Sequence, residues 1–228
     1  MMKTIARIHT AFPTKFGIPR QSGIIETLQG TIVFEPEYRV PDAVRGLEGF
    51  SHLWLIWEFS EAKRDTWSPT VRPPRLGGNT RMGVFATRSP FRPNPIGLSS
   101  VKLEKVEIDP NLGPVLHVSG ADLMDGTPIF DIKPYIVYTD CHPEAVSGFA
   151  NKPAEQLLEV DCPTGQLQRV DESLRDSLLA VLAHDPRPQY QDDPERVYGM
   201  AFGPYEVRFK VNDLNLTVLD ILKKKDLI

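Results

Sequence analysis

Short apolar segments of strand length recur through the first 140 residues and alternate with turn-forming residues. They are rich in Val, Ile, Phe and Trp, which are the residues that strands favour. The segments cover residues 3–9, 30–35, 52–59, 82–87, 99–108, 114–120 and 127–136. Residues 109–113 (DPNLG) predict a turn that closes an antiparallel pair. Because the strands follow one another without intervening helices, the pattern predicts a barrel or a sandwich.

The pattern changes near residue 140. Residues 141–160 are small and polar, which predicts a linker between a barrel domain at 1–140 and a second domain at 161–228. In that second domain four apolar residues recur at helical spacing and predict one amphipathic helix. They are Leu174, Leu178, Val181 and Leu182.

The end of the chain returns to strict alternation of apolar and polar residues. Residues 207–211 and 214–218 each place an apolar residue at every second position, on either side of Asn212 and Asp213. This arrangement predicts a terminal β-hairpin. The whole chain is therefore expected to be mainly β, a barrel followed by a small α+β domain.

Composition narrows the class of protein. The 228 residues are 41% apolar and 25% charged, within the ordinary globular range. The longest unbroken apolar run, residues 178–183, is far shorter than the roughly 20 residues of a membrane helix. Without a signal-peptide pattern the chain is expected to act in the cytoplasm, away from membranes. The five histidines and two cysteines lack metal-ligand spacing, so no metal site is expected.

Charge is unevenly distributed along the chain. The net charge is −4, yet residues 63–92 hold seven basic residues and one acid, a local charge of +6 that leaves −10 elsewhere. Six prolines fall between Pro69 and Pro95, which excludes a long helix there. A stiff basic segment on an acidic protein favours an anionic partner such as RNA. A solvated loop without a partner is the alternative reading of the same residues.

Several long motifs resemble one known family. They are IPRQ (18–21), DAVRGLEGFSHLWL (42–55), residues 69–106 and GADLMDGTPIFDIKPY (120–135). Together they resemble the TsaA-like β-barrel family over roughly residues 4–140, and the end of the chain resembles its smaller C-terminal domain. The resemblance implies an S-adenosylmethionine-dependent methyltransferase that acts on N6 of threonylcarbamoyl-adenosine at position 37 of tRNA, beside the anticodon. It also suggests a homodimer.

The same resemblance assigns cofactor-binding residues. They are Pro19, Arg20, Gln21, Ser60, Glu61, Arg88, Leu98, Asp122, Leu123, Met124 and Asp125. Family members often carry a histidine at the position of Ser60, so only a backbone contact is expected there. The side chains of Leu98, Leu123 and Met124 could form apolar walls, and the aspartates could accept hydrogen bonds from the cofactor. Alternatively, the aspartates only shape a turn and the arginines bind tRNA phosphates.

Catalysis and RNA recognition complete the expectations. The acceptor nitrogen must lose a proton, and Asp125 or Asp131 could take it, with Asn94 as a further hydrogen-bonding group. The arginines expected to bind the anticodon loop are Arg72, Arg75, Arg81, Arg92 and Arg187. Two other functions stay open at this point: a non-catalytic RNA-binding module on the same barrel, and a methyltransferase with a small-molecule acceptor.

Overall fold

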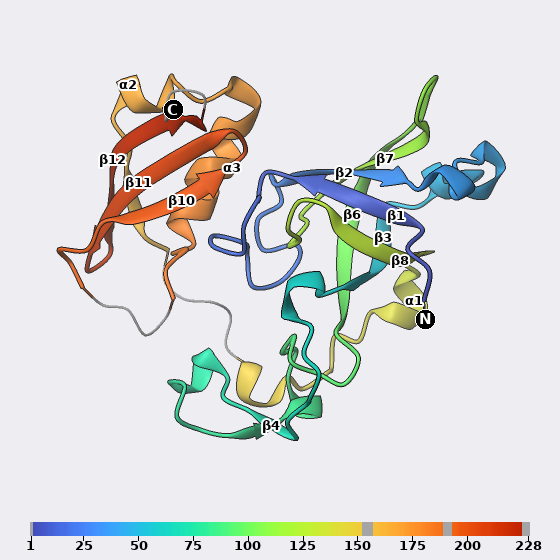
Figure 1. Cartoon of the computed structure of the whole chain (residues 1–228), viewed down its shortest axis with the longest axis horizontal. Helices are drawn as coiled ribbons and strands as arrows, with labels where there is room; N and C mark the ends of the chain where they lie inside the picture. The colour runs from blue at the N-terminus through green and yellow to red at the C-terminus, as the bar shows by residue number, and fades with distance from the viewer. Residues whose placement is uncertain (1, 152–156, 189–192, 225–228) are drawn as a thin grey trace.

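The computed structural model describes residues 2–151, 157–188 and 193–224, and Figure 1 shows two units joined side by side. Six antiparallel strands close into a barrel in the order β1-β2-β7-β6-β3-β8. Their bounds are β1 (Ala6–Thr10), β2 (Gln29–Phe34), β3 (His52–Glu58), β6 (Ile96–Asp109), β7 (Gly113–Ser119) and β8 (Thr127–Pro134). The expectation of a mainly β chain with a barrel is confirmed.

Alternation along each strand fills the barrel. In β3, Leu53, Leu55 and Trp57 are buried in the barrel core, while the residues between them face outward. The expected turn at residues 109–113 joins β6 to β7, which pair antiparallel. β6 is 14 residues long and pairs with β3 through its first half and with β7 through its second.

An arm of residues 60–95 leaves the barrel between β3 and β6 and is visible below it in Figure 1. It holds a short antiparallel pair, β4 (Thr70–Val71) and β5 (Met82–Gly83). The expected strand at residues 82–87 is therefore wrong beyond Gly83, because Val84–Ala86 form a 3-10 turn with the Val84 side chain buried.

The second domain is a four-stranded sheet with helices on it. Its strand order is β10-β11-β12-β9, with β9 parallel to β12. The elements are β9 (Glu159–Asp161), β10 (Tyr198–Phe202), β11 (Tyr205–Asn212), β12 (Asn215–Lys223), α2 (Thr164–Leu167) and α3 (Glu172–Ala183). The predicted helix and terminal hairpin are both confirmed.

The expected linker contains ordered elements where the structure describes it. A single short turn of helix, α1 (Val137–Asp140), ends the barrel domain just before it, and a 3-10 turn covers Gly148–Ala150. β9 occupies the last part of the range 141–160 and belongs to the second sheet. Residues 152–156 of that range lie outside the described residues.

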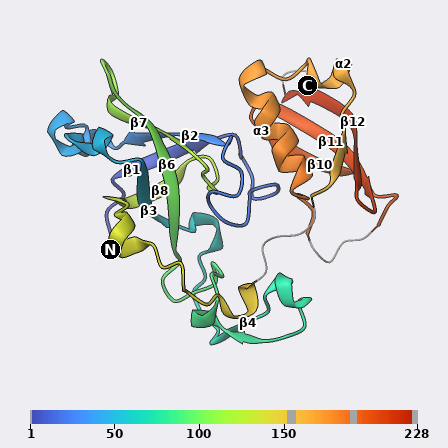
Figure 2. The same ribbon diagram turned by 180° about the vertical axis from the view of Figure 1, so that it is seen from behind.

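A connecting segment, residues 11–28, joins β1 to β2 and lies between the two units in Figures 1 and 2. Phe12, Ile25 and Leu28 are buried in the core of the second domain rather than in the barrel. The N-terminal part of the chain therefore contributes side chains to the core of the second domain, which is formed mainly by C-terminal residues. No helix in the described ranges has the length and apolar character needed to cross a membrane.

Candidate cofactor site

The connecting segment brings the IPRQ motif to one end of the barrel. Its backbone is fixed there because the Gly23 amide donates to the Gly120 carbonyl oxygen at 2.9 Å. One residue earlier, the Ser22 hydroxyl accepts a hydrogen bond from the Ser100 amide of β6 at 3.2 Å. The loops that carry Gln21 and Asp122 are thus held together at the same end of the barrel.

Gln21 and Arg88 meet at this end of the barrel. Arg88 Nη1 donates a hydrogen bond to Gln21 Oε1, which joins the IPRQ loop to the ATRS segment of the arm. The charge of Arg88 also reaches Asp122, whose carboxylate it helps to keep ionised. Three of the residues that the resemblance assigns to the cofactor are therefore neighbours in space.

A hydrogen-bonded chain runs from the barrel core to Asp122. The buried Trp57 Nε1 donates to Ser99 Oγ at 3.0 Å, and Ser99 Oγ donates to Asp122 Oδ1 at 2.6 Å. Gly97, two residues before Ser99 on the same face of β6, lies directly against the indole ring of Trp57. The absence of a side chain at Gly97 lets the ring reach Ser99.

Two opposing effects set the charge of Asp122. Burial raises the pKa of its carboxyl, because the charged form loses contact with water. The hydrogen bond from Ser99 lowers the pKa, with smaller contributions from the amides of Asp122 and Ser22 and from Arg88. Burial outweighs these, so Asp122 takes up a proton at a higher pH than an exposed aspartate.

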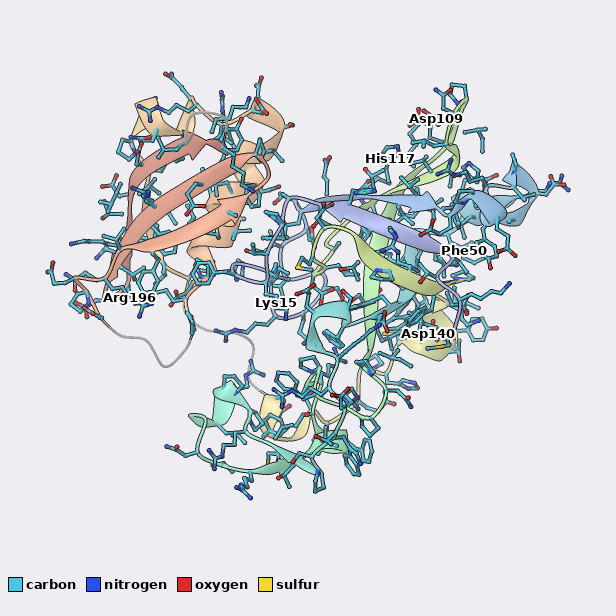
Figure 3. All side chains as sticks on the ribbon, in the orientation of Figure 1. Lys15, Phe50, Asp109, His117, Asp140 and Arg196 are labelled. Atoms are coloured by element: carbon cyan, nitrogen blue, oxygen red, sulfur yellow. The ribbon has the colours of Figure 1, made fainter. Side chains whose placement is uncertain are left out.

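Ser60 and Glu61 lie in a 3-10 turn (Ser60–Ala62) that begins two residues after the end of β3. Lys15 of the connecting segment, labelled in Figure 3, donates from Nζ to the Glu61 carbonyl oxygen at 2.8 Å. The Phe59 amide donates to the Pro95 carbonyl oxygen at 2.8 Å, which holds this turn beside the proline-rich loop. Hydrogen bonds thus hold the turn's backbone to the connecting segment and to the proline-rich loop.

The three expected apolar wall residues differ in position. Leu123 is 1% exposed and packs inside the barrel, so its side chain contributes to the core. Leu98 is 56% exposed and points to the outer face of β6, opposite to Ser99, because neighbours along a strand alternate faces. Met124 is half-buried. The structure does not place the Leu98 side chain on the same side of β6 as the buried cluster around Asp122.

The two candidate bases are separated. Asp125 Oδ1 accepts hydrogen bonds from the Thr10 amide at 3.1 Å and lies 3.2 Å from His9 Nδ1. Asp131 lies on the outer face of β8, opposite Ile56 in the register, and pairs with Lys133 at 2.9 Å.

Asn94, the other group expected to act in catalysis, is exposed in the proline-rich loop, where its carbonyl oxygen accepts from the Ile96 amide at 2.8 Å. Of the three residues expected to act in catalysis, Asp125 alone lies in the same loop as Asp122.

The arginines expected to contact RNA fall into two groups. Arg72, Arg75 and Arg81 are exposed on the arm, and Arg75 donates to the Ala150 carbonyl oxygen at 3.1 Å. Arg92 is partly buried and donates to the carbonyl oxygens of Thr87 and Ser89 at 2.7 and 3.4 Å, so it holds its own loop. Arg187 is 10% exposed and forms a two-pronged pair with Asp185 at 2.8 and 2.9 Å.

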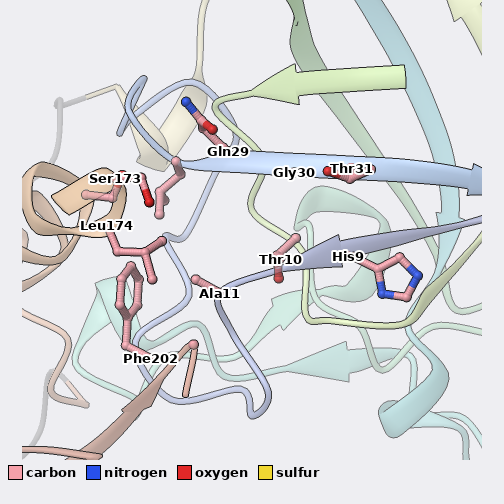
Figure 4. Close-up of a pocket in the computed structure, with 12 residues that line it drawn as sticks. His9, Thr10, Ala11, Gln29, Gly30, Thr31, Ser173, Leu174 and Phe202 are labelled. Carbon is pink, nitrogen blue, oxygen red and sulfur yellow. The ribbon is translucent and has the colours of Figure 1, made fainter. Parts of the chain in front are cut away.

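A cavity of about 310 Å³ opens between the barrel and the second domain. Figure 4 shows His9 and Thr10 of β1 on one side and Ser173 and Leu174 of α3 on the other. The His9–Asp125 pair therefore stands at the rim of an open interdomain space.

Sequence reasoning missed Trp57, Ser99, Ser22 and His9. For Ser99 a signal existed: Val101 and Leu103 are core residues, so a period of two along β6 places Ser99 inside the barrel as well. A serine on a buried face needs a hydrogen-bond partner. Which partner it takes depends on a loop 23 residues away, and nothing in the spacing predicts that.

Taken together, the fold and site define a two-domain β-barrel protein with a cluster of polar side chains at one end of the barrel. Two family models match the chain: the tRNA-methyltransferase O N-terminal domain over residues 7–141 and the TrmO C-terminal domain over residues 155–224. The chain belongs to the tRNA-methyltransferase O family.

Named relatives match almost end to end. The tRNA (adenine(37)-N6)-methyltransferase of Escherichia coli is 41% identical over 222 residues, 94% of each chain. A Pseudomonas aeruginosa protein provisionally named an S-adenosylmethionine-dependent methyltransferase is 40% identical over 90% of each chain. The crystal structure of TrmO from Pseudomonas aeruginosa has a TM-score of 0.78 at 33% identity and covers 97% of this chain and 98% of its own.

Proposed function

We propose that this protein transfers a methyl group from S-adenosylmethionine to N6 of adenine 37 in tRNA, with threonylcarbamoyl-adenosine as the form it accepts. The observation that carries the proposal is the match to the Escherichia coli enzyme over 94% of both chains. The gathered polar groups at the barrel end support it, because a cofactor with hydroxyl, ammonium and carboxylate groups needs such partners.

The donor set fits S-adenosylmethionine, which supplies an activated methyl group when bound. The Asp122 carboxylate, held by Ser99, can accept hydrogen bonds from ribose hydroxyls or from the ammonium group. Arg88 can meet the cofactor carboxylate, and Gln21 fixes the direction of its guanidinium. Pro19 and Arg20 precede Gln21 in the same loop, and the backbone of Ser60 and Glu61 can complete the wall.

Asp125 is the candidate that we favour as proton acceptor. Its carboxylate is partly exposed and is oriented by the Thr10 amide and by His9, at the surface of the loop that also carries Asp122. Positioning the acceptor nitrogen and the methyl donor can itself contribute about 7–11 kcal/mol. Asp131 is the second candidate for the proton acceptor, because its carboxylate is already paired with Lys133. Asn94 stays a candidate hydrogen-bonding group, since an amide does not take up a proton.

The arm supplies the proposed contact with the anticodon loop. Arg72 and Arg81 are exposed there, and exposed guanidinium groups can bind phosphates or stack on unpaired bases. Arg75 extends the same surface. Arg187 and Arg92 contribute less directly, since each already binds groups of its own chain.

Salt dependence distinguishes Arg81 from Arg92. We expect Arg81→Ala to weaken tRNA binding and to reduce the slope of log Kobs against log salt by about 0.7, the value for one single-stranded phosphate contact. Arg92→Ala should weaken binding with a smaller change in slope, because its guanidinium stabilises the loop from Thr87 to Ser89. Fluorescence anisotropy with labelled tRNA between 50 and about 200 mM salt measures both slopes. Equal slopes for Arg81→Ala and the unaltered chain would remove Arg81 from the phosphate contacts.

A methyl-transfer assay tests the function itself. Purified protein is mixed with methyl-labelled S-adenosylmethionine and with tRNA that carries or lacks the threonylcarbamoyl group. Label should enter only the modified tRNA, at position 37. Cofactor binding without transfer to either tRNA would favour a small-molecule acceptor, and tRNA binding without cofactor binding would favour a non-catalytic RNA-binding module.

We also propose that two copies associate and that the protein acts in the cytoplasm, where its tRNA substrate is. Large apolar side chains are exposed over the arm and the end of the barrel domain, which supports a partner surface. They include Phe85, Leu98, Val137 and Tyr138. A single monomeric species in sedimentation equilibrium at micromolar concentration would argue against the dimer.

A further inference from the structure

The connecting segment is attached to the second domain by apolar packing and by hydrogen bonds at both ends. The Phe12 ring meets Phe202 edge-on, with centroids 5.6 Å apart and planes at 77°. The Gly203 amide donates to the Ala11 carbonyl oxygen at 2.6 Å. At the far end, the buried Ser177 hydroxyl of α3 donates to the Thr27 carbonyl oxygen at 2.7 Å.

The contact continues to the residues assigned to the cofactor. Gly17 has a φ of +89°, and a Cβ there would lie 2.4 Å from Met200 Sδ, so the backbone lies directly on β10. The next residues, through Pro19 and Arg20, line a cavity of about 70 Å³ whose opposite wall includes Val181 and His184 of the second domain. One side of the IPRQ loop therefore faces the second domain.

The other side of the segment is hydrogen-bonded to the barrel domain. There Gln21 accepts from Arg88, Ser22 accepts from the Ser100 amide, and the Gly23 amide donates to Gly120. These contacts are polar, whereas Ile25 and Leu28 bury their apolar surface in the second domain. Because buried apolar surface is the larger stabilising contribution, the second domain does most to order the segment.

We propose that the second domain is a structural part of the cofactor site, with Phe12 and Ser177 as positioning residues that hold Pro19, Arg20 and Gln21 in place. The inference rests on the proposed function, since it concerns affinity for S-adenosylmethionine. Its physical basis is preorganisation: a segment that is already ordered does not lose conformational freedom when the ligand binds. Neither residue needs to touch the cofactor.

Ser177→Ala tests this with little change in packing, because it removes one hydroxyl. Isothermal titration of the full chain with S-adenosylmethionine should show affinity reduced roughly three- to tenfold, the effect of one buried hydrogen bond. Phe12→Leu should give a loss of similar size. In both variants, the amides of residues 17–25 should exchange hydrogen faster in the absence of ligand.

Val211→Ala is the matched control. It shortens a buried residue of the same core, but it pairs with Leu216 at the hairpin end of the sheet, away from the Met200–Gly203 end that the segment covers. It should lower the stability of the second domain and leave the affinity for S-adenosylmethionine unchanged. Equal losses of affinity in Val211→Ala and Ser177→Ala would show a general effect of destabilisation and overturn the proposal.

A double variant shows whether the effect passes through the IPRQ loop. If it does, Ser177→Ala should cost less affinity in a Gln21→Ala background than in the unaltered chain. If the loss of affinity in the double variant equals the product of the losses in the two single variants, the proposal is overturned. If the unaltered chain fails to bind S-adenosylmethionine, the proposed function itself fails. If the unaltered chain and Ser177→Ala bind equally well, only the positioning role fails.

Discussion

Replacing Asp122 by Asn should lower the affinity for S-adenosylmethionine by about 10- to 150-fold, the range for losing one hydrogen bond to a charged group. Asn keeps the size of the side chain and removes the charge that Ser99 and Arg88 orient. Isothermal titration at neutral pH measures the effect. Asp109→Asn, at the turn labelled at the tip of the β6–β7 hairpin in Figure 3, is the control and should bind like the unaltered chain.

The pH dependence of binding gives a second readout. Burial raises the pKa of Asp122 above the ordinary aspartate value of about 3.9. The Asp122 carboxyl is therefore fully ionised at pH values above its raised pKa, and it loses its charge as the pH falls through that pKa. Affinity should fall with the pH over that window in the unaltered chain and stay level in Asp122→Asn. A parallel fall in both proteins would assign the pH dependence to another group.

Protein stability should respond in the opposite direction. A carboxyl whose pKa is raised by folding favours the folded state when it is protonated, and that contribution is lost as the pH rises through the raised value. At neutral pH the charged Asp122 therefore opposes folding. Asp122→Asn should unfold at the same or a higher urea concentration, so a loss of binding cannot be attributed to unfolding.

Gly97→Ala should destabilise the barrel by roughly 2–3 kcal/mol and lower its Tm by roughly 5–10 °C. The added Cβ would lie 2.2 Å from Cε2 of Trp57, a distance that no rotation of the alanine can relieve. Because Trp57 is buried and rigid, either the indole or β6 has to move, and the hydrogen bond to Ser99 is then lost.

Urea unfolding followed by tryptophan fluorescence measures this effect in the barrel alone. All three tryptophans, at positions 54, 57 and 67, lie in the barrel domain. Gly83→Ala is the control, because nothing lies within 4 Å of the Cβ that it adds. An unfolding midpoint for Gly97→Ala that matches Gly83→Ala would contradict the role given to the bare backbone at position 97.

The elements that could be predicted are those with a strong local signal. β11 alternates apolar and polar residues, the helix repeats its apolar residues at 3.6, and β3 is rich in the residues that strands favour, so local sequence alone identified all three. β9 has three residues and is stabilised by its parallel partner β12, so its own sequence carries too little signal.

The site was predictable only in its parts. Motif resemblance assigned Gln21, Arg88 and Asp122, and the structure brings these three together. It could not tell that Leu98 and Asp122 lie on opposite sides of β6, although the period of two in that strand contains the information. Apolar residues in the connecting segment likewise indicate burial without saying which of two cores they enter.

The order of synthesis gives the connecting segment a further consequence. Phe12, Ile25 and Leu28 leave the ribosome early, but the side chains that cover them include Phe202, more than 170 residues later. At about 5–20 residues per second, Phe12 lacks its contact with Phe202 for roughly 10–40 s. The connecting segment is thus made before the core that buries it, and synthesis of the last strands ends its exposure to aggregation.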